Sequence, residues 1–267
     1  MIPKLKDILE LLEKVAPLRL AEPWDNPGLQ VGSYSQEIKK IFLALDPTKK
    51  ALKSASENNA QLLLTHHPLI FKPLSQIDIH AFPGDVLFEA VKSEISIVSA
   101  HTNLDMARGG INDILADLLG LQHVEVLKEI HEEQGVGLGR IGVLPGPTGL
   151  SVVIEQIKRI LGTEKLKIIG KQDIQISRLA VVGGSGGGLV SIASKKGAEL
   201  LLTGDVGHHH ALEALSLGLV LIDGGHFHTE KTAFKVFGER LQVMLRTKKW
   251  EVAVEVDKDE TDPMNDR

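Results

Sequence analysis

The sequence contains no cysteine. Disulfide bonds and thiolate metal ligands are therefore both excluded. Any bound metal ion would have to be held by imidazole nitrogens and carboxylate oxygens. These ligands suit Zn, Mn, Fe or Co better than Cu(I) or an iron–sulfur cluster.

Long apolar runs and a basic block are also lacking. No apolar run reaches the roughly 18 residues that a membrane span needs. The first residues, MIPKLKDILELLEK, mix acids and bases through their apolar positions, which argues against a signal peptide. The formal net charge of −5 argues against a nonspecific grip on nucleic acid. We expect a cytoplasmic protein with neither membrane nor nucleic acid as a partner.

The chain does contain a regular alternation of strands and helices. Its 267 residues, 43% apolar and 24% charged, are typical of one large or two medium globular domains. Apolar spacing distinguishes the two kinds of element. The predicted strands are residues 39–46, 60–65, 95–100, 178–182, 199–203, 219–223 and 250–256. The predicted helices are residues 4–15, 47–58, 84–93, 110–119, 151–161, 188–196, a segment within 204–218, and 230–241.

Three stretches lack this regular pattern. Residues 21–32 are rich in Pro, Asn and Gly and are predicted to be a loop. Residues 122–150 are harder to assign, and the glycine alternation over 136–145 favours a strand or hairpin. Residues 257–267 are a polar tail without assigned structure.

The two halves of the chain resemble each other. NAQLLLTHH, from Asn59, matches GAELLLTGD, from Gly197, at an offset of 138 residues. The same offset brings IFLALD, from Ile41, onto LAVVGG, from Leu179. A shared local strand–helix pattern without duplication is the simpler alternative.

The match extends to polar residues. At a shorter offset of 125 residues, His101 falls on His226 and Asp105 falls on Glu230. We therefore predict an α/β fold of two similar units, with mixed sheets flanked by helices, that arose by internal duplication. The metal site is expected in the cleft between the units. The predicted units are residues 1–125 and 126–256, followed by the tail 257–267.

Histidines and acids follow three of the predicted strands, in LLLTHHP, VSAHTNLD and LIDGGHFHTEK. The carboxyl ends of strands are where α/β proteins bind ligands. The candidate metal ligands are His66, His67, Asp105, His226 and Glu230. Shared between two ions, with one carboxylate bridging them, three imidazoles and two carboxylates leave positions open for water, as a catalytic site requires.

Each of these groups also has a simpler interpretation. An adjacent His-His pair can lie solvated in a loop. Asp105 can cap the helix expected near residue 110, and His226 with Glu230 can be an exposed imidazole followed by a capping acid. The occurrence of all three groups at strand ends favours the metal site.

Two further features are less specific. His208, His209 and His210 are successive residues of one predicted helix, so at most one of them is expected to reach the site. Gly183–Gly188 lie between a strand and a helix, where backbone N–H groups can bind phosphate. Their spacing fits neither G-x-G-x-x-G nor a P-loop. Tight helix–strand packing and a looser phosphate contact therefore both stay open.

Six ordered motifs resemble those of the dinuclear-metal family of GTP cyclohydrolase I type 2 homologues, the Ngg-interacting-factor-like proteins. They are AEPWDNPGLQVG, LLLTHHPLIF, SAHTNLDMARGGIND, AVVGGSGG, TGDVGHHHALEA and GGHFHTEK, and the resemblance spans residues 5–256. It implies a two-domain α/β fold in a ring-shaped homohexamer. It also implies two divalent ions per chain on the five candidate ligands, with Glu230 touching both. The short 122–150 segment implies the family's short form, and Pro27 is a departure that leaves ligation unaffected.

The resemblance also implies hydrolysis of a nucleotide-like substrate. The cyclohydrolase name implies opening of the guanine imidazole ring of GTP by metal-activated water. Two ions would lower the pKa of a bridging water toward about 7. His101 or His209, held off the metals, would then carry the proton.

Other members of this family are associated with phosphoester hydrolysis or with partner binding only. The alternatives are therefore a metal-dependent phosphoesterase, a non-catalytic metal-binding or regulatory scaffold, and a nucleotide-cofactor protein that uses Gly183–Gly188.

Overall fold

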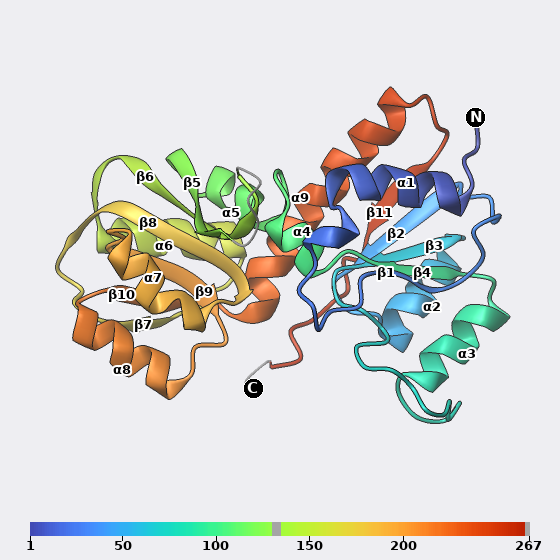
Figure 1. Ribbon diagram of the computed structural model, residues 1–267, viewed down its shortest axis with the longest axis horizontal. Coiled ribbons are helices and arrows are strands. Elements are labelled where there is room, and N and C mark those ends of the chain that lie inside the picture. Colours follow the sequence, from blue (N-terminus) through green and yellow to red (C-terminus); the bar gives the residue numbers. More distant parts are fainter. Residues whose placement is uncertain (130–134, 265–267) are drawn as a thin grey trace. The chain divides into compact units, whose positions relative to one another are not determined.

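The computed structural model describes residues 1–129 and 135–264 and divides the chain into two compact units. The first unit comprises Met1–Leu104 and Phe234–Arg267, and the second comprises Asp105–Ala233. The two boundaries fall within helices α4 (Thr102–Met106) and α9 (His226–Thr247). Each unit is a sheet flanked by helices, which confirms the predicted fold class (Figure 1).

The first unit contains a mixed five-stranded sheet in the order β1-β4-β3-β2-β11. Its strands are β1 (Gly28–Val31), β2 (Lys40–Ala44), β3 (Leu62–Thr65), β4 (Ser96–Ser99) and β11 (Ala253–Val256). β1 is antiparallel to β4, and the other neighbours are parallel. The central strands are buried on both faces, which explains their almost continuous apolar sequences.

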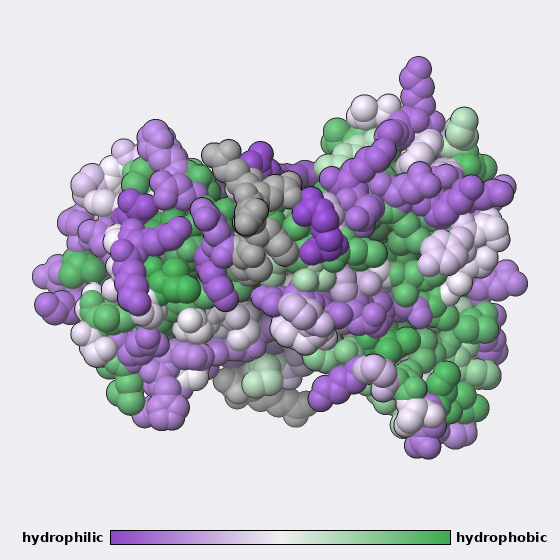
Figure 2. Space-filling model, viewed as in Figure 1, coloured by the Kyte–Doolittle hydropathy of each residue, from purple (hydrophilic) through white to green (hydrophobic). Residues whose placement is uncertain are grey.

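Helices cover both faces of this sheet (Figure 1). On one face, α2 (Lys49–Glu57) and α3 (Gly84–Lys92) pack against Phe42 and Leu63. On the other face lie α1 (Leu5–Val15) and the C-terminal part of α9, where Gly238 approaches Leu43. A short 3-10 helix, η1 (Leu18–Leu20), follows α1. Apolar side chains also remain exposed in this unit and gather over α3 in Figure 2.

The second unit contains a mixed six-stranded sheet in the order β5-β6-β8-β9-β10-β7. Its strands are β5 (Gln122–Glu129), β6 (Gly137–Gly149), β7 (Lys167–Ile169), β8 (Gln175–Ser185), β9 (Leu200–Gly204) and β10 (Val220–Asp223). β8, β9 and β10 are parallel, whereas the remaining pairs are antiparallel. β6 confirms the strand that was one of the two alternatives for residues 136–145, and it pairs with β5 in an antiparallel ladder.

Helices flank this sheet as well. α7 (Val190–Lys195), preceded by the 3-10 helix η2 (Gly187–Leu189), and α8 (His208–Leu217) pack on the face that carries Leu201 and Leu221. α5 (Ile111–Leu118) and α6 (Leu150–Leu161) pack against β6 and β8 on the other face. Alternate residues of each parallel strand therefore serve two separate apolar layers.

Both units contain the same parallel arrangement of three strands and two helices. In the first, Ile41 pairs with Leu62. In the second, the residues 138 positions later, Leu179 and Leu200, pair in the same register. The repeat found in the sequence therefore corresponds to one topology used twice, β2-α2-β3-α3-β4 and β8-α7-β9-α8-β10.

The division into units differs from the predicted boundary at residues 125/126. α5 packs on β6 and β8, so the segment after Asp105 belongs to the second unit. β11 pairs in parallel with β2, which returns the C-terminal segment to the first unit. Neither association leaves a local sequence signal, because each joins segments that lie far apart along the chain.

Several elements also differ from the sequence-based assignment. β1 lies within the predicted loop 21–32, and β7 was not predicted. Asp105 lies in the helix α4 and not in a loop that opens the next helix. α9 begins at His226, four residues before the predicted start. No helix in the described part of the chain combines the length and apolarity that crossing a bilayer requires.

Candidate metal centre

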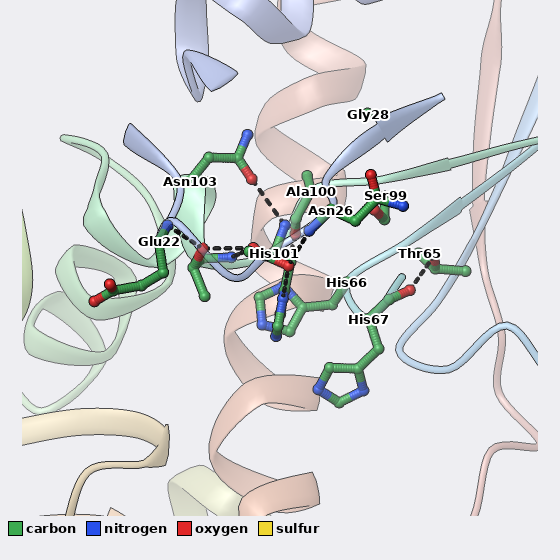
Figure 3. Close-up of polar contacts among 12 residues, drawn as sticks. Glu22, Asn26, Gly28, Thr65, His66, His67, Ser99, Ala100, His101 and Asn103 are labelled. Atoms are coloured by element: carbon green, nitrogen blue, oxygen red, sulfur yellow. Dashed lines mark hydrogen bonds and ion pairs between the residues drawn. The ribbon is translucent and has the colours of Figure 1, made fainter. Parts of the chain in front are cut away.

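Three imidazoles of the first unit meet at the ends of two neighbouring parallel strands. His66 and His67 follow β3, and His101 follows β4. Their ligand atoms all lie within 4.8 Å of one another. Figure 3 shows the three rings together at these strand ends. Because the strands end side by side, residues 34 positions apart become neighbours.

Each of these imidazoles is held through its Nδ1 atom. The acceptors are the Ala100 carbonyl for His66 (2.7 Å), Asp46 Oδ1 for His67 (2.7 Å) and Asp25 Oδ1 for His101 (2.8 Å). A carbonyl or carboxylate oxygen only accepts, so the proton lies on Nδ1 and the lone pair lies on Nε2. This is the arrangement that metal-ligating histidines adopt, with the second nitrogen fixed by an acceptor.

Asp25 is the most firmly held of these acceptors. Its side chain is fully buried (0% exposed). It accepts hydrogen bonds from the backbone and hydroxyl of Thr102 as well as from His101. Burial by itself raises the pKa of Asp25, but its hydrogen bonds with His101 and Thr102 lower the pKa to about 2. The carboxylate therefore stays ionised near neutral pH and fixes the orientation of the His101 ring.

The second unit contains an imidazole and a carboxylate one helical turn apart. His226 and Glu230 share one face of the first turn of α9. His226 Nδ1 lies 2.7 Å from Asp205 Oδ2, and His226 Nε2 lies 3.0 Å from Glu230 Oε2. When His226 donates its Nδ1 proton to Asp205, the lone pairs of His226 Nε2 and Glu230 Oε2 face each other unless a proton or a cation lies between them. Ligands of one tetrahedral ion, at bonds of about 2.1 Å, are about 3.4 Å apart. The spacing therefore fits a shared cation as well as an ion pair.

The glycine run of the second unit packs against this pair. A Cβ atom on Gly184 would lie 2.1 Å from Glu230 Oε1, so only glycine leaves room for the carboxylate. The backbone N–H groups of the run donate to side chains within the unit. They are those of Gly183 to Asn112 Oδ1, Gly184 to Thr229 Oγ1, and Gly186 to Thr203 Oγ1. The run therefore serves close helix–strand packing, which accounts for its glycines without a phosphate ligand.

Asp105 is buried in the second unit, with 7% of its surface exposed. Its backbone carbonyl accepts a hydrogen bond from Asn112 Nδ2. The Asn112 side chain also accepts from Gly183, and it thereby connects α4 to the glycine run. Glu230 is also buried, with 3% of its surface exposed. The interior of the protein tolerates two acidic groups such as Asp105 and Glu230 only when they have compensating partners.

The three successive histidines of α8 diverge. The rings of His208 and His209 contact each other at 5.8 Å between centroids, and both residues are exposed. The His210 ring instead packs against Gly187, where a Cβ atom would lie 2.2 Å from Nδ1. The catalytic role expected of His209 stays a prediction.

The sequence alone did not identify Asp25, Asp46 and Asp205, the acids that orient the histidines. Asp46 follows β2 and Asp205 follows β9, so the strand-end rule that selected the histidines applies to both. The internal repeat carries a second signal, since Asp205 lies 138 positions after His67. Asp25 gave no such signal, because it lies in the loop before β1.

The motifs of the sequence match one family model over residues 3–263, described as Duf34/NIF3 (NGG1p interacting factor 3). The chain belongs to this family. It is 36% identical over 260 residues to a GTP cyclohydrolase 1 type 2 homolog of Clostridium perfringens, covering 97% of this chain and 98% of that protein. It is 38% identical over 226 residues to the GTP cyclohydrolase 1 type 2 of Helicobacter pylori, covering 85% and 86%. The crystal structure of a Bacillus cereus protein related to NIF3 superposes with a TM-score of 0.92 over 100% of both chains, at 26% identity.

The donor set of this Duf34/NIF3 chain fits divalent metal ions. It consists of imidazoles whose Nδ1 atoms are fixed and of buried carboxylates, which are ligands typical of Zn, Mn, Fe and Co. The space kept at Gly184 for the Glu230 carboxylate agrees with this. The described residues therefore contain His and Glu groups that suit metal ions, as the sequence predicted.

Proposed function

We propose that this Duf34/NIF3 chain is a hydrolase that uses two divalent metal ions on a nucleotide-like substrate, in the manner of a GTP cyclohydrolase 1 type 2. The proposed ligands are His66, His67, Asp105, His226 and Glu230. The observation that carries the proposal is the shared orientation of the imidazoles. His66, His67 and His226 each direct Nδ1 to a fixed oxygen acceptor, which supports ligation through Nε2.

The ions would supply one part of the chemistry, since bound divalent cations lower the pKa of water and polarise a substrate oxygen. The chain supplies the rest. In this proposal His101 receives a proton at Nε2, and the ionised Asp25 stabilises the resulting imidazolium from the Nδ1 side. Because Thr102 holds Asp25 by two hydrogen bonds, His101 needs no reorientation when its charge changes.

The experiment combines metal analysis with turnover. Protein purified without chelator is expected to contain about two divalent ions per chain by elemental analysis, as in dinuclear hydrolytic sites. Reloaded protein is expected to hydrolyse GTP or a related nucleotide only in the presence of metal. The Glu230→Gln variant should lose this activity while its circular dichroism and metal-free melting temperature stay close to those of the parent.

A matched control is Glu239→Gln, an exposed glutamate of the same helix, which should keep full activity. Metal-replete protein that is inert on a broad panel of nucleotides would count against the hydrolase. Such inert protein, if it also melts at a markedly lower temperature after chelation, would support the non-catalytic metal-binding scaffold instead.

A further inference from the structure

Two aromatic side chains stand exposed beside the imidazole cluster of the first unit. Trp24 is 56% exposed and Phe71 is 46% exposed. Their ring centroids are 5.6 Å apart with the planes tilted by 48°. Each ring also approaches His101, at 6.1 Å for Trp24 and 6.4 Å for Phe71. A chain with only 4% aromatic residues thus places two of them in contact with the same histidine.

The backbone on both sides of these rings is fixed by hydrogen bonds. Asp25, which follows Trp24, is bound by His101 and Thr102. Asn26 Nδ2 donates to the Ile70 carbonyl at 2.7 Å, and the Ile70 N–H donates to Gln30 Oε1 at 3.0 Å. Ile70 immediately precedes Phe71, and Asn26 lies two residues after Trp24, so these hydrogen bonds join the loop before β1 to the loop after β3 close to both aromatic residues in the sequence. Figure 3 shows Asn26 beside His101 in this arrangement.

This combination of fixed backbone and exposed rings is unusual for a structural role. A Trp that stabilises a fold buries most of its surface, whereas Trp24 exposes more than half of it. No acceptor among the described residues takes the Trp24 indole N–H, so that donor is available to a ligand. The exposed apolar residues of α3, such as Phe88, do not share the contact with His101.

We infer that Trp24 and Phe71 form a stacking surface for the planar heterocycle of the substrate, a purine base. Aromatic side chains bind bases through their π-faces, and a preorganised ring loses little entropy when it does so. His101 is the contact that connects this surface to the imidazole cluster. A base stacked on Trp24 and Phe71 would therefore lie next to the group proposed to move a proton. The identity of the ring rests on the proposed function, whereas the existence of the surface does not.

The test measures binding without turnover. In a Trp250→Phe background Trp24 is the single tryptophan, because the chain has only two. Metal-free protein is titrated with GMP and, separately, with ribose 5-phosphate. We expect saturable quenching of Trp24 fluorescence by GMP and none by ribose 5-phosphate. Calorimetric titration of Trp24→Ala and Phe71→Ala should show GMP affinity about tenfold or more weaker, whereas Trp24→Phe should stay within a few-fold of the parent.

Phe88→Ala is the matched control, since Phe88 is 44% exposed in the same unit and should leave GMP affinity unchanged. Equal GMP affinity in Trp24→Ala and the parent overturns the inference. Ribose 5-phosphate binding as tight as GMP binding, or no saturable GMP binding by metal-free or metal-loaded protein, overturns it too. If Trp24→Ala or Phe71→Ala changes the mass measured by light scattering but leaves the GMP affinity unchanged, the inference is also overturned. The rings would then belong to a contact between copies of the chain.

These outcomes separate the stacking surface from the hydrolase. GMP binding through Trp24 by a protein that never turns over with metal would support the surface and sink the hydrolase. Metal-dependent nucleotide hydrolysis with an unchanged KM in Trp24→Ala would support the hydrolase and contradict the stacking surface.

Discussion

At the scale of single residues, the acids behind the histidines are as informative as the histidines themselves. A neutral imidazole ligates through one nitrogen only when its proton has been assigned to the other. Asp46, Asp25 and Asp205 make that assignment for His67, His101 and His226. Each comes from a loop after or before a strand, so the orientation of the rings depends on the tertiary fold.

Replacing one of these acids should weaken metal binding without touching a ligand. Asp205→Asn keeps the shape and tolerates the positive φ of 53° at this position, but it loses the charge opposite His226. We expect the affinity for Zn²⁺ to fall about 10- to 100-fold, as measured by competition with a chromogenic chelator. Asp173→Asn, an exposed acid of the same unit, should have no effect. Equal affinities in both variants would contradict the orienting role of Asp205.

Asp25 makes part of the stability depend on pH. Its pKa is lowered from 3.8 to about 2 in the folded protein, so the folded state favours the ionised form. The resulting stabilisation, about 2 kcal/mol, is present above pH 4 and is lost as the pH falls toward 2. Asp25→Asn should therefore be less stable than the parent at pH 7, and the difference should shrink below pH 4. Urea unfolding at pH 7, 4 and 2.5 measures it, and a constant difference across these pH values would contradict the assignment.

At the scale of elements, the glycine run shows how a strand end can be shaped by a helix that arrives later in the chain. Gly184 has a φ of +63° and leaves room for Glu230. Gly162 has a similar φ of +65° at the end of α6, but a Cβ atom there would meet nothing within 4 Å. A comparison of the same substitution at Gly162 and at Gly184 therefore separates the cost of backbone strain from the cost of lost space for Glu230.

Gly162→Ala should therefore cost only the strain of a left-handed alanine, about 1–2 kcal/mol of unfolding free energy. Gly184→Ala should cost more and should also lower the metal content, because Glu230 must move away from the added methyl group. Thermal unfolding of the metal-free variants and elemental analysis provide the two measurements. Retention of full metal content in Gly184→Ala would show that the Glu230 carboxylate does not need this space.

The elements predicted correctly from the sequence are those with a local signal. The parallel strands are continuous apolar runs, and α1 shows apolar residues at helical spacing, so both follow from neighbouring residues. β1 is held only by pairing with the distant β4. Its sequence, GLQV, directly follows Asn26 and Pro27, and this combination of Asn, Pro and Gly is typical of a loop. α9 begins at His226 because Gly225, with a φ of +82°, turns the chain directly into the helix.

The candidate site was predictable to a similar degree. The strand-end rule selects His66, His67 and His226 directly, and helical spacing selects Glu230. The rule was not extended to Asp46 and Asp205, although both follow strands. Trp24 and Phe71 could not be paired from the sequence, because their contact depends on the hydrogen bonds that join two separate loops.

At the scale of the whole molecule, assembly rests on the family resemblance, and we propose a homohexamer on that ground. Light scattering of the purified chain should give six times the 29.0 kDa mass of one chain. The family resemblance also implies that the metal sites face an internal cavity of the ring, so metal removal is expected to leave this mass unchanged. A monomer or dimer at micromolar concentration would contradict the expectation.

The route of the chain through the two units has a consequence for synthesis on the ribosome. The second unit is contiguous, so all of its strands have been made before residue 234 emerges. The first unit begins earlier and finishes later, because β2 gains its neighbour β11 only when Ala253–Val256 has been translated. Until then β2 presents an open sheet edge, which is a template for pairing with other nascent chains. The part of the protein that is made first is thus completed last.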